Sequence, residues 1–245
     1  MDRHPAVEQH SVVTSLVLHL LPGLLIGLCY WALLQPVRRW GYPSIMALMI
    51  ALALVLVPVE AGYLLYQGYR KHGRLSLRGV VAYRTPIPIW QYLIWVPVVF
   101  VAAGIVFTVM KPVDAFFQRT LFGWLPALES GLEGGYSRGV LIATYAMVAI
   151  FGALLGPVVE EFYFRGYLLP RMNYAGKWAP VLHSFLFALY HVFTPWLIVT
   201  RTLALLPLVL VVQRRNLTIG IIVHVLLNML DVVAGVSYII AMVMS

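Results

Sequence analysis

The chain is a succession of long apolar runs that are separated by short polar and basic segments. A transmembrane helix takes about 20 apolar residues. Windows low in charge lie at about 12–34, 43–66, 90–110, 139–157, 178–194, 196–212, 216–230 and 231–244. Their apolar positions are continuous rather than alternating, which argues against a β-barrel. The pattern therefore predicts an all-α, polytopic integral membrane protein with about eight transmembrane helices.

The composition supports a location in the membrane. Of the 245 residues, 62% are hydrophobic and 11% are charged, whereas soluble domains have roughly 45–50% and about 25%. This excludes a soluble enzyme, a disordered protein and a nucleic-acid-binding module. The single cysteine, Cys29, lies in an apolar run, so it forms no internal disulfide and no multi-cysteine metal site.

The net charge of +8 is best explained by basic loops on one side of the membrane. With eight spans, the side of the amino terminus holds Arg3, Arg70, Lys71, Arg74, Arg78, Arg84, Arg171, Lys177, Arg214 and Arg215. The other side holds Arg38, Arg39, Lys111, Arg119 and Arg138. The excess predicts that the first side is cytoplasmic and that both termini lie there.

The chain divides into two parts by content. Residues 1–138 contain three predicted transmembrane helices with a basic connection at 68–89 and an amphipathic, interfacial connection at 111–138. Residues 139–245 form a predicted helix bundle that carries the candidate chemistry. The first part contains no motif.

Three ionisable residues follow the fourth apolar run. Each charge at a membrane centre costs about 2.5–3.5 kcal/mol, so Glu160, Glu161 and Arg165 need compensation. Glu161 and Arg165 are four positions apart, share one helix face and are expected to pair. Glu160 lies about 100° around the helix. It must therefore be protonated or find a partner on another helix, which makes it a candidate general base. Water is expected to reach it from the cytoplasmic end of this helix.

Two further predicted helices offer partners for Glu160. One ends with Phe187 and His191, and another carries His224 and Asn228 four positions apart on one face. A carboxylate, two imidazoles and a carboxamide can thus converge in one pocket of low dielectric. The alternative is that these side chains only join helices by hydrogen bonds, as buried His and Asn do in membrane bundles.

These residues form three motifs in a fixed order along the chain. They are Glu160-Glu161-x-x-x-Arg165, Phe187-x-x-x-His191 and His224-x-x-x-Asn228. The set resembles the family of CAAX prenyl proteases and bacteriocin-processing enzymes, also called the CPBP or Abi family. The resemblance covers roughly residues 139–244 and implies an eight-helix intramembrane endopeptidase.

The resemblance also implies roles for individual residues. Glu160 would activate a water as a glutamic endopeptidase does, and His191 would assist it. His224 and Asn228 would stabilise the oxyanion or position the water. The supporting residues would be Glu161, Arg165 and Phe187, with Arg165 holding Glu161 and ordering the helix end. The implied partners are the lipid bilayer and a membrane protein or lipidated peptide as substrate.

Metal dependence and two other functional classes stay open. A mechanism without a cofactor is favoured because the helical zinc-protease signature His-Glu-x-x-His is absent. A zinc enzyme would use Glu160, His191 and His224. A polytopic transporter, or a non-catalytic membrane scaffold or immunity protein, could use the same polar residues.

Arg201 lies inside the sixth apolar window. It has three interpretations: its side chain extends to the interface, it pairs with Asp231 or Glu60, or it binds a substrate carboxylate. Glu60 lies near the far end of the second window and needs a polar partner or the interface.

Two more histidines lie in apolar windows. His183 shares a helix face with Phe187 and His191, so it is either a hydrogen-bond partner for the site or a residue that faces a headgroup or helix backbone. His19, in the first window, is interpreted as structural.

Overall fold

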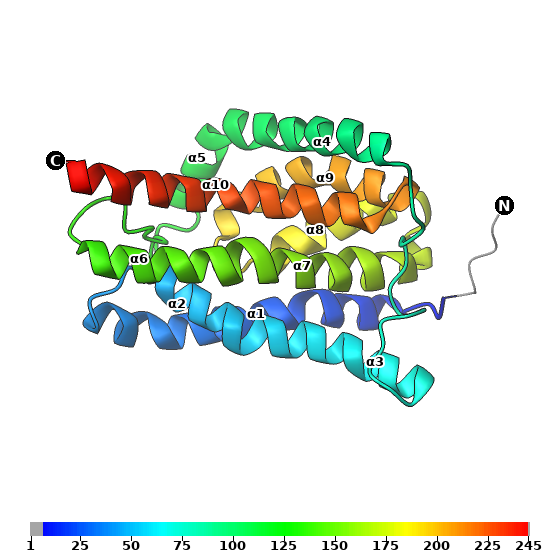
Figure 1. The fold of residues 1–245 in the computed structure, drawn as a ribbon. Coiled ribbons are helices and arrows are strands. Elements are labelled where there is room, and N and C mark those ends of the chain that lie inside the picture. The colour runs from blue at the N-terminus through cyan, green and yellow to red at the C-terminus, as the bar shows by residue number, and fades with distance from the viewer. Residues whose placement is uncertain (1–6, 245) are drawn as a thin grey trace.

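The long apolar runs form long helices that pack side by side (Figure 1). The computed structural model describes residues 7–244, and this part of the chain contains helices and no strand. The α-helices are α1 (Val12–Arg39), α2 (Ser44–Ala51), α3 (Gly62–His72), α4 (Ile89–Val109), α5 (Lys111–Thr120), α6 (Arg138–Met147), α7 (Gly156–Glu160), α8 (Ala179–Tyr190), α9 (Ile198–Arg214) and α10 (Leu217–Met244). The prediction of an all-α fold is confirmed for the described residues.

Two of the long helices are composite. The π-helical turns Leu52–Ala61 join α2 to α3. The turns Val148–Leu155 join α6 to α7, and Glu161–Leu168 continue α7. Short 3₁₀ segments cover Leu169–Arg171, Asn173–Trp178 and Pro195–Leu197. Wider π-helical turns are frequent at functional sites, and here they carry Glu60, Glu161 and Arg165.

Six helices of the described chain are long and apolar enough to cross a membrane, which makes it a multi-pass membrane protein. The prediction of about eight spans is not confirmed. The windows 216–230 and 231–244 form one continuous helix, α10, because Asp231 between them does not break a helix. The window 178–194 contains only the 12-residue α8, which ends at Tyr190.

α1 begins at one end of the bundle, and α10 ends at the opposite end (Figure 1). Just before α1, the His10 amide donates to the carbonyl of Arg171 at 3.1 Å, where the fourth span ends. In α10, Gly235 lies against the ring of Tyr145, whose hydroxyl donates to the carbonyl of Ser130 at 3.3 Å, before that span begins. That both termini are cytoplasmic stays a prediction.

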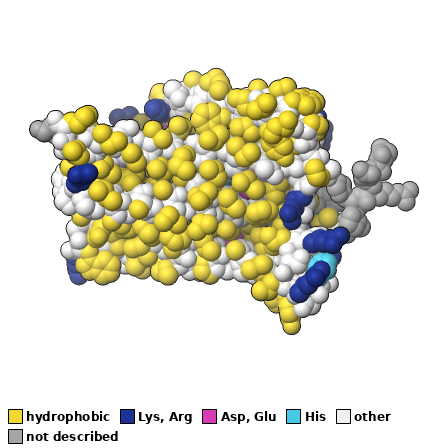
Figure 2. All heavy atoms as spheres, viewed as in Figure 1, with side chains coloured by type: hydrophobic (Ala, Val, Ile, Leu, Met, Phe, Trp, Pro, Cys, Tyr) yellow, Lys and Arg dark blue, Asp and Glu magenta, His cyan; other side chains and the backbone are white. Residues whose placement is uncertain are grey.

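On the face shown in Figure 2, Lys and Arg side chains gather toward the ends of the bundle, and hydrophobic side chains cover the surface between them. The connection 73–88 lies at the same end as the start of α1 and the start of α10. There, the Ala82 amide donates to the carbonyl of Gly166, and the Leu217 amide donates to that of Tyr83. The basic connections thus stay grouped as the sequence predicts. That this end is cytoplasmic remains a prediction.

Close packing of α1 on the end of α8 positions the residues around the site. A Cβ atom at Gly23 would lie 2.0 Å from the carbonyl oxygen of Tyr190, and one at Gly27 would lie 2.4 Å from Val192. At position 23, only glycine allows this approach of the two backbones. The ring of Phe164 also packs edge-on against Phe187 and Tyr190 of α8, with centroids 4.8 Å apart in both cases. The last turn of α8 is therefore held on two sides.

Candidate active site

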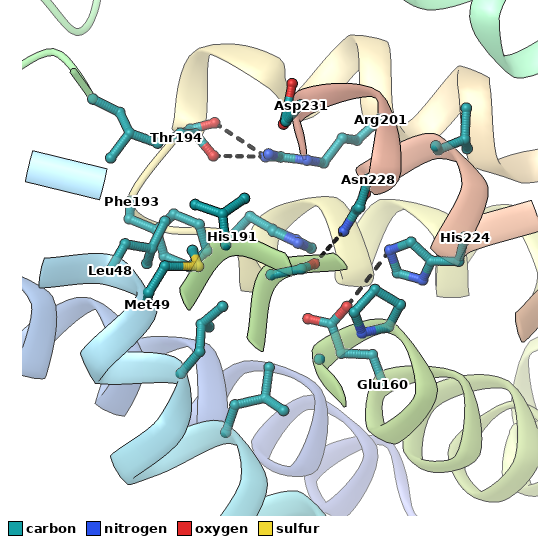
Figure 3. A pocket seen from close by; sticks show the side chains of 18 of the residues that line it. Leu48, Met49, Glu160, His191, Phe193, Thr194, Arg201, His224, Asn228 and Asp231 are labelled. Carbon is teal, nitrogen blue, oxygen red and sulfur yellow. Dashed lines mark hydrogen bonds and ion pairs between the residues drawn. The ribbon is translucent and has the colours of Figure 1, made fainter. Parts of the chain in front are cut away.

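Glu160, the last residue of α7, faces His224 of α10 inside the bundle (Figure 3). Its Oε2 lies 3.7 Å from His224 Nε2, and each of the two residues is 6% exposed. This distance exceeds a direct hydrogen bond, which spans about 2.7–3.2 Å. Of the two alternatives for Glu160, protonation or a partner on another helix, the approach of His224 corresponds to the second.

Glu161 binds two partners at once and is fully buried. Its Oε1 lies 3.2 Å from Arg165 Nη1, one turn further along the same helix, and it lies 3.0 Å from Nδ1 of His224. The pairing of Glu161 with Arg165 is confirmed as the spacing predicts. The bond to His224 is additional, and it connects the first motif to the third.

The ring of Phe187 contacts side chains from all three motifs. The guanidinium carbon of Arg165 lies 3.8 Å from the centre of its ring, a cation–π geometry. The rings of His191 and His224 stand edge-on to the same ring at 4.8 Å and 6.1 Å. An aromatic residue four positions before His191 thus fixes the positions of three polar side chains.

His191 follows the last residue of α8, and its side chain has a defined tautomer. Nδ1 lies 2.8 Å from the carbonyl oxygen of Phe187. Because a carbonyl oxygen only accepts hydrogen bonds, Nδ1 carries the proton and donates. In the neutral ring, Nε2 is then an acceptor. His191 also lines the cavity beside Glu160.

Asn228 lies one turn beyond His224 on the same face of α10, as the sequence predicts. Its Nδ2 donates to the carbonyl oxygen of Gly152 at 2.9 Å, across to the π-helical turns before α7. This bond uses one of the two amide N–H groups and leaves the second N–H and Oδ1 without a partner among the described residues. The side chain lines the same cavity as Glu160.

A cavity of about 210 Å³ connects these residues. Glu160 lies at one end, and the wall continues to Ile45 at the start of α2 and Leu128 in the loop before α6. The cavity therefore runs toward the end of the bundle at which α10 ends. From the charge count, this end is predicted to lie outside the cytoplasm. The expectation that water reaches Glu160 from the cytoplasmic end does not fit this direction.

Gly220 is a residue of the site that the sequence reasoning missed. It lies one turn before His224 on α10, and a Cβ atom there would lie 2.7 Å from Glu161 Oε2 and 2.7 Å from Val212. The absence of a side chain makes room for the Glu161 carboxylate. The available signal was the position of this glycine four residues before His224.

Glu60 and Tyr190 form a second polar contact that sequence reasoning did not assign to the site. Glu60 is fully buried in the π-helical turns after α2, and the Tyr190 hydroxyl donates to its Oε1 at 2.8 Å. Its Oε2 has no hydrogen bond in the described chain. The partner that Glu60 needs is thus a tyrosine directly before His191. The sequence signal for this contact was the presence of the ionisable Glu60 inside an apolar window.

His19 and His183 form a separate pair and do not line the cavity. His19 Nδ1 donates to the Ser15 carbonyl at 2.7 Å, and His19 Nε2 lies 3.0 Å from His183 Nδ1. Both side chains are fully buried, and both rings pack against Phe164. The interpretation of His19 as structural fits this position. His183 faces another histidine rather than a headgroup.

Arg201 makes no ion pair with Asp231 or Glu60. Within the described chain no carboxylate oxygen lies within 4.0 Å of its guanidinium. Its Nη1 donates to the Thr194 hydroxyl at 2.8 Å (Figure 3). Arg201 and Asp231 both line the cavity.

The residues that a zinc enzyme would need do not form a metal-binding group in this structure. Between residues 7 and 244, no three His, Cys, Asp or Glu side chains are arranged so that they could hold a metal ion. This applies to Glu160, His191 and His224 as well. A mechanism without metal stays a prediction.

A helical membrane bundle in which a carboxylate, two imidazoles and a carboxamide line one cavity has the groups that general acid–base hydrolysis needs. Comparison with known proteins adds a similarity over part of the chain. Residues 142–230 match the family described as type II CAAX prenyl endopeptidase Rce1-like. The match confirms the similarity to the CPBP/CAAX protease family. The matched segment contains all three motifs. The match implies a CAAX-protease-like membrane enzyme.

No curated protein and no solved structure matches the chain significantly. The matched segment lies within residues 139–245, the part predicted to carry the chemistry. The division of the chain at residue 138 stays a prediction.

Proposed function

We propose that the protein is an intramembrane endopeptidase in which Glu160 activates water to hydrolyse a peptide bond. The observation that carries this proposal is the position of Glu160. It faces His224 across 3.7 Å in a cavity that His191 and Asn228 also line. All four residues lie within 142–230, the segment that is similar to CAAX prenyl endopeptidases.

In the proposed reaction, a water molecule lies between Glu160 and His191. The Glu160 carboxylate takes one proton from the water, while Nε2 of His191, an acceptor in the neutral ring, orients the other hydrogen. The hydroxide oxygen attacks the carbonyl carbon of the substrate and forms a tetrahedral intermediate. The C–N bond then breaks, and Glu160 returns its proton to the amine nitrogen.

His224 and Asn228 are proposed to stabilise the negative oxygen of the intermediate. Asn228 has a second N–H group that the bond to Gly152 leaves free. His224 is held at Nδ1 by Glu161, so the nitrogen that faces Glu160 is Nε2, which donates when the ring is protonated. Donors fixed in this way stabilise an oxyanion without reorganisation during the reaction.

Glu161 and Arg165 act through these residues and not on the substrate. Both are fully buried, and the bond from Glu161 fixes the orientation of the His224 ring. Arg165 in turn holds Glu161 at 3.2 Å and rests on the ring of Phe187. Removal of any of these side chains would leave a buried partner uncompensated.

The proposed substrate is a membrane protein or lipidated peptide that is cut near its membrane-embedded or lipidated end. The family name refers to prenylated substrates. Six helices that could cross a bilayer place the cavity among membrane spans, where a soluble peptide is a less suitable substrate. An S-prenylated peptide with a quenched fluorophore is therefore the probe to test first.

The test is the Glu160→Gln variant of the full-length protein, purified in detergent. General base catalysis contributes about 10²–10⁴-fold, so the variant should lose nearly all hydrolysis of the fluorogenic peptide. It should elute as wild type in size-exclusion chromatography. The matched control is Glu133→Gln, because Glu133 lies in the loop before α6, where it accepts hydrogen bonds from Ser130 and Gly131. Wild-type hydrolysis by the Glu160→Gln variant would rule the mechanism out.

A further inference from the structure

The cavity that contains Glu160 also contains a cationic side chain that the proposed hydrolysis does not use. Arg201 lies in the first turn of α9. Its Nη1 donates to the hydroxyl of Thr194 at 2.8 Å and to the Thr194 carbonyl at 3.4 Å (Figure 3). Thr194 precedes α9 and thus orients the guanidinium plane.

No acidic side chain of the described chain forms an ion pair with Arg201. The nearby Asp114 accepts a hydrogen bond from the Thr200 hydroxyl and forms no ion pair with Arg201. Asp231 lines the cavity but also forms no ion pair. An unpaired charge inside a membrane span is costly, and such residues usually pair or mark a binding site. The missing partner is therefore expected to come from a bound molecule.

Arg165 is a structural arginine of this bundle, and its surroundings differ from those of Arg201. It is fully buried, pairs with Glu161 and packs on Phe187. Arg201 is only partly buried, and its Nε and Nη2 atoms form no hydrogen bond and are not enclosed by protein. Two adjacent nitrogens of its guanidinium thus remain free to donate.

We propose that Arg201 binds a carboxylate of the peptide substrate and thereby selects which peptide bond reaches Glu160. A planar guanidinium with two free nitrogens matches the two oxygens of a carboxylate. Arg201 is the single Lys or Arg among the described residues that line the cavity, which suits one negative charge. The inference rests on the proposed function, because the ligand is a substrate only if Glu160 cleaves it.

The carboxylate has two sources, which are the free carboxyl terminus of the substrate and an Asp or Glu side chain close to the scissile bond. Both present the same planar anion. In either case, the contact fixes the number of residues between the anion and the bond that is cut, because Arg201 and Glu160 occupy fixed places in one small cavity.

The experiment uses three forms of one S-prenylated fluorescent peptide. The first ends in a free carboxylate, the second in a carboxamide, and the third in a carboxamide with an added Asp. Affinity is measured on the full-length Glu160→Gln protein, which binds without cleaving, and KM on the wild type. Hydrogen bonds between charged groups predict that the carboxylate form binds about 10- to 100-fold more tightly than the carboxamide. Recovery of affinity by the third form would identify a side-chain carboxylate as sufficient.

Substitution of Arg201 then assigns this preference to one side chain. The carboxylate-to-carboxamide ratio should fall to about one in Arg201→Met and to an intermediate value in Arg201→Lys, which keeps the charge without the planar fork. The control is Arg38→Met, since Arg38 pairs with Glu129 and does not line the cavity. It should preserve the ratio.

Equal affinity for the first two forms, or an unchanged ratio in both Arg201 variants, would overturn the proposal. If the wild type cleaves both forms equally in a Glu160-dependent way, the proposed function stands and the role of Arg201 fails. If no form is cleaved but the affinity ratio depends on Arg201, the carboxylate site stands and the proposed function fails.

Discussion

Four histidines lie inside the bundle and form two groups in different surroundings. His19 and His183 are 3.0 Å apart, fully buried and bonded to each other, with no access to the cavity. His191 and His224 both line the cavity, and each has its Nδ1 bound to the protein, while Nε2 of His224 lies 3.7 Å from Glu160.

The comparison separates helix-joining histidines from histidines that are available for chemistry. In the buried pair, each ring uses a nitrogen to hold the other ring, so the pair connects α1 to α8. In the cavity pair, the protein fixes Nδ1 of each ring, which orients Nε2. The residue type alone therefore does not predict function in a membrane bundle. A histidine that lines a cavity with one ring nitrogen unbound is the better candidate for catalysis.

The largest effect is expected for His191→Ala. Loss of the acceptor that orients the water should lower kcat by about 10²–10⁴-fold, with little change in the unfolding temperature. His183→Ala is the matched control, because His183 lies on α8 two turns before His191 and does not line the cavity, and it should keep kcat within a few fold. Hydrolysis of the fluorogenic peptide measures both variants. Equal losses of kcat would remove the distinction between the two groups.

A smaller effect on the cavity pair is expected for Gly220→Ala. The new methyl group would meet Glu161 Oε2 and Val212 at 2.7 Å, which should displace the carboxylate from His224. A misplacement of about 1 Å can cost about 10²-fold in rate, and overpacking costs about 1–3 kcal/mol in the free energy of unfolding.

Gly104→Ala is the control for this substitution. Gly104 lies in α4, where an added Cβ meets no atom within 4 Å. Activity and thermal unfolding should match wild type. Wild-type activity in Gly220→Ala would show that the contact of Glu161 with His224 has no part in catalysis.

A stability effect is expected for the buried pair. His183→Ala removes the partner of His19 and should lower the free energy of unfolding by about 1 kcal/mol, the scale of side-chain hydrogen bonds in membrane bundles. A double-mutant cycle of His19→Ala with His183→Ala should show coupling. The same cycle with His183→Ala and His191→Ala should show none. Coupling between His183 and His191 would connect the two groups.

The smallest effect is expected from removal of metal ions. The Glu160 mechanism uses no metal, so dialysis against a chelator should leave hydrolysis unchanged, and metal analysis should find no stoichiometric zinc. Loss of activity on chelation with recovery on addition of zinc would instead assign the cavity pair to metal binding.

Sequence reasoning located the helices and the residues of the cavity because both depend on spacing along one helix. The pair Glu161 and Arg165, and the shared face of His224 and Asn228, follow directly from the helical repeat. The apolar windows likewise fix where helices run. The number of spans was not predictable to the same degree, because α10 continues through Asp231 without a break.

Contacts between helices were less accessible to prediction. The bond of Glu161 to His224, the space at Gly220 and the contact of Tyr190 with Glu60 each join distant segments. Their geometry depends on π-helical turns that shift the register of side chains, and no spacing rule reports these turns in advance. A glycine or tyrosine is also common in membrane helices for other reasons.

The direction of the cavity connects the chemistry to a compartment. It runs from Glu160 toward the end of the bundle at which α10 finishes, and the start of α1 lies at the opposite end. The water consumed and any polar fragment released would therefore be exchanged with the compartment that a reporter fused after α10 detects. A reporter fused before α1 would detect the other compartment, so one pair of fusions would assign the compartment of the product without any knowledge of the substrate.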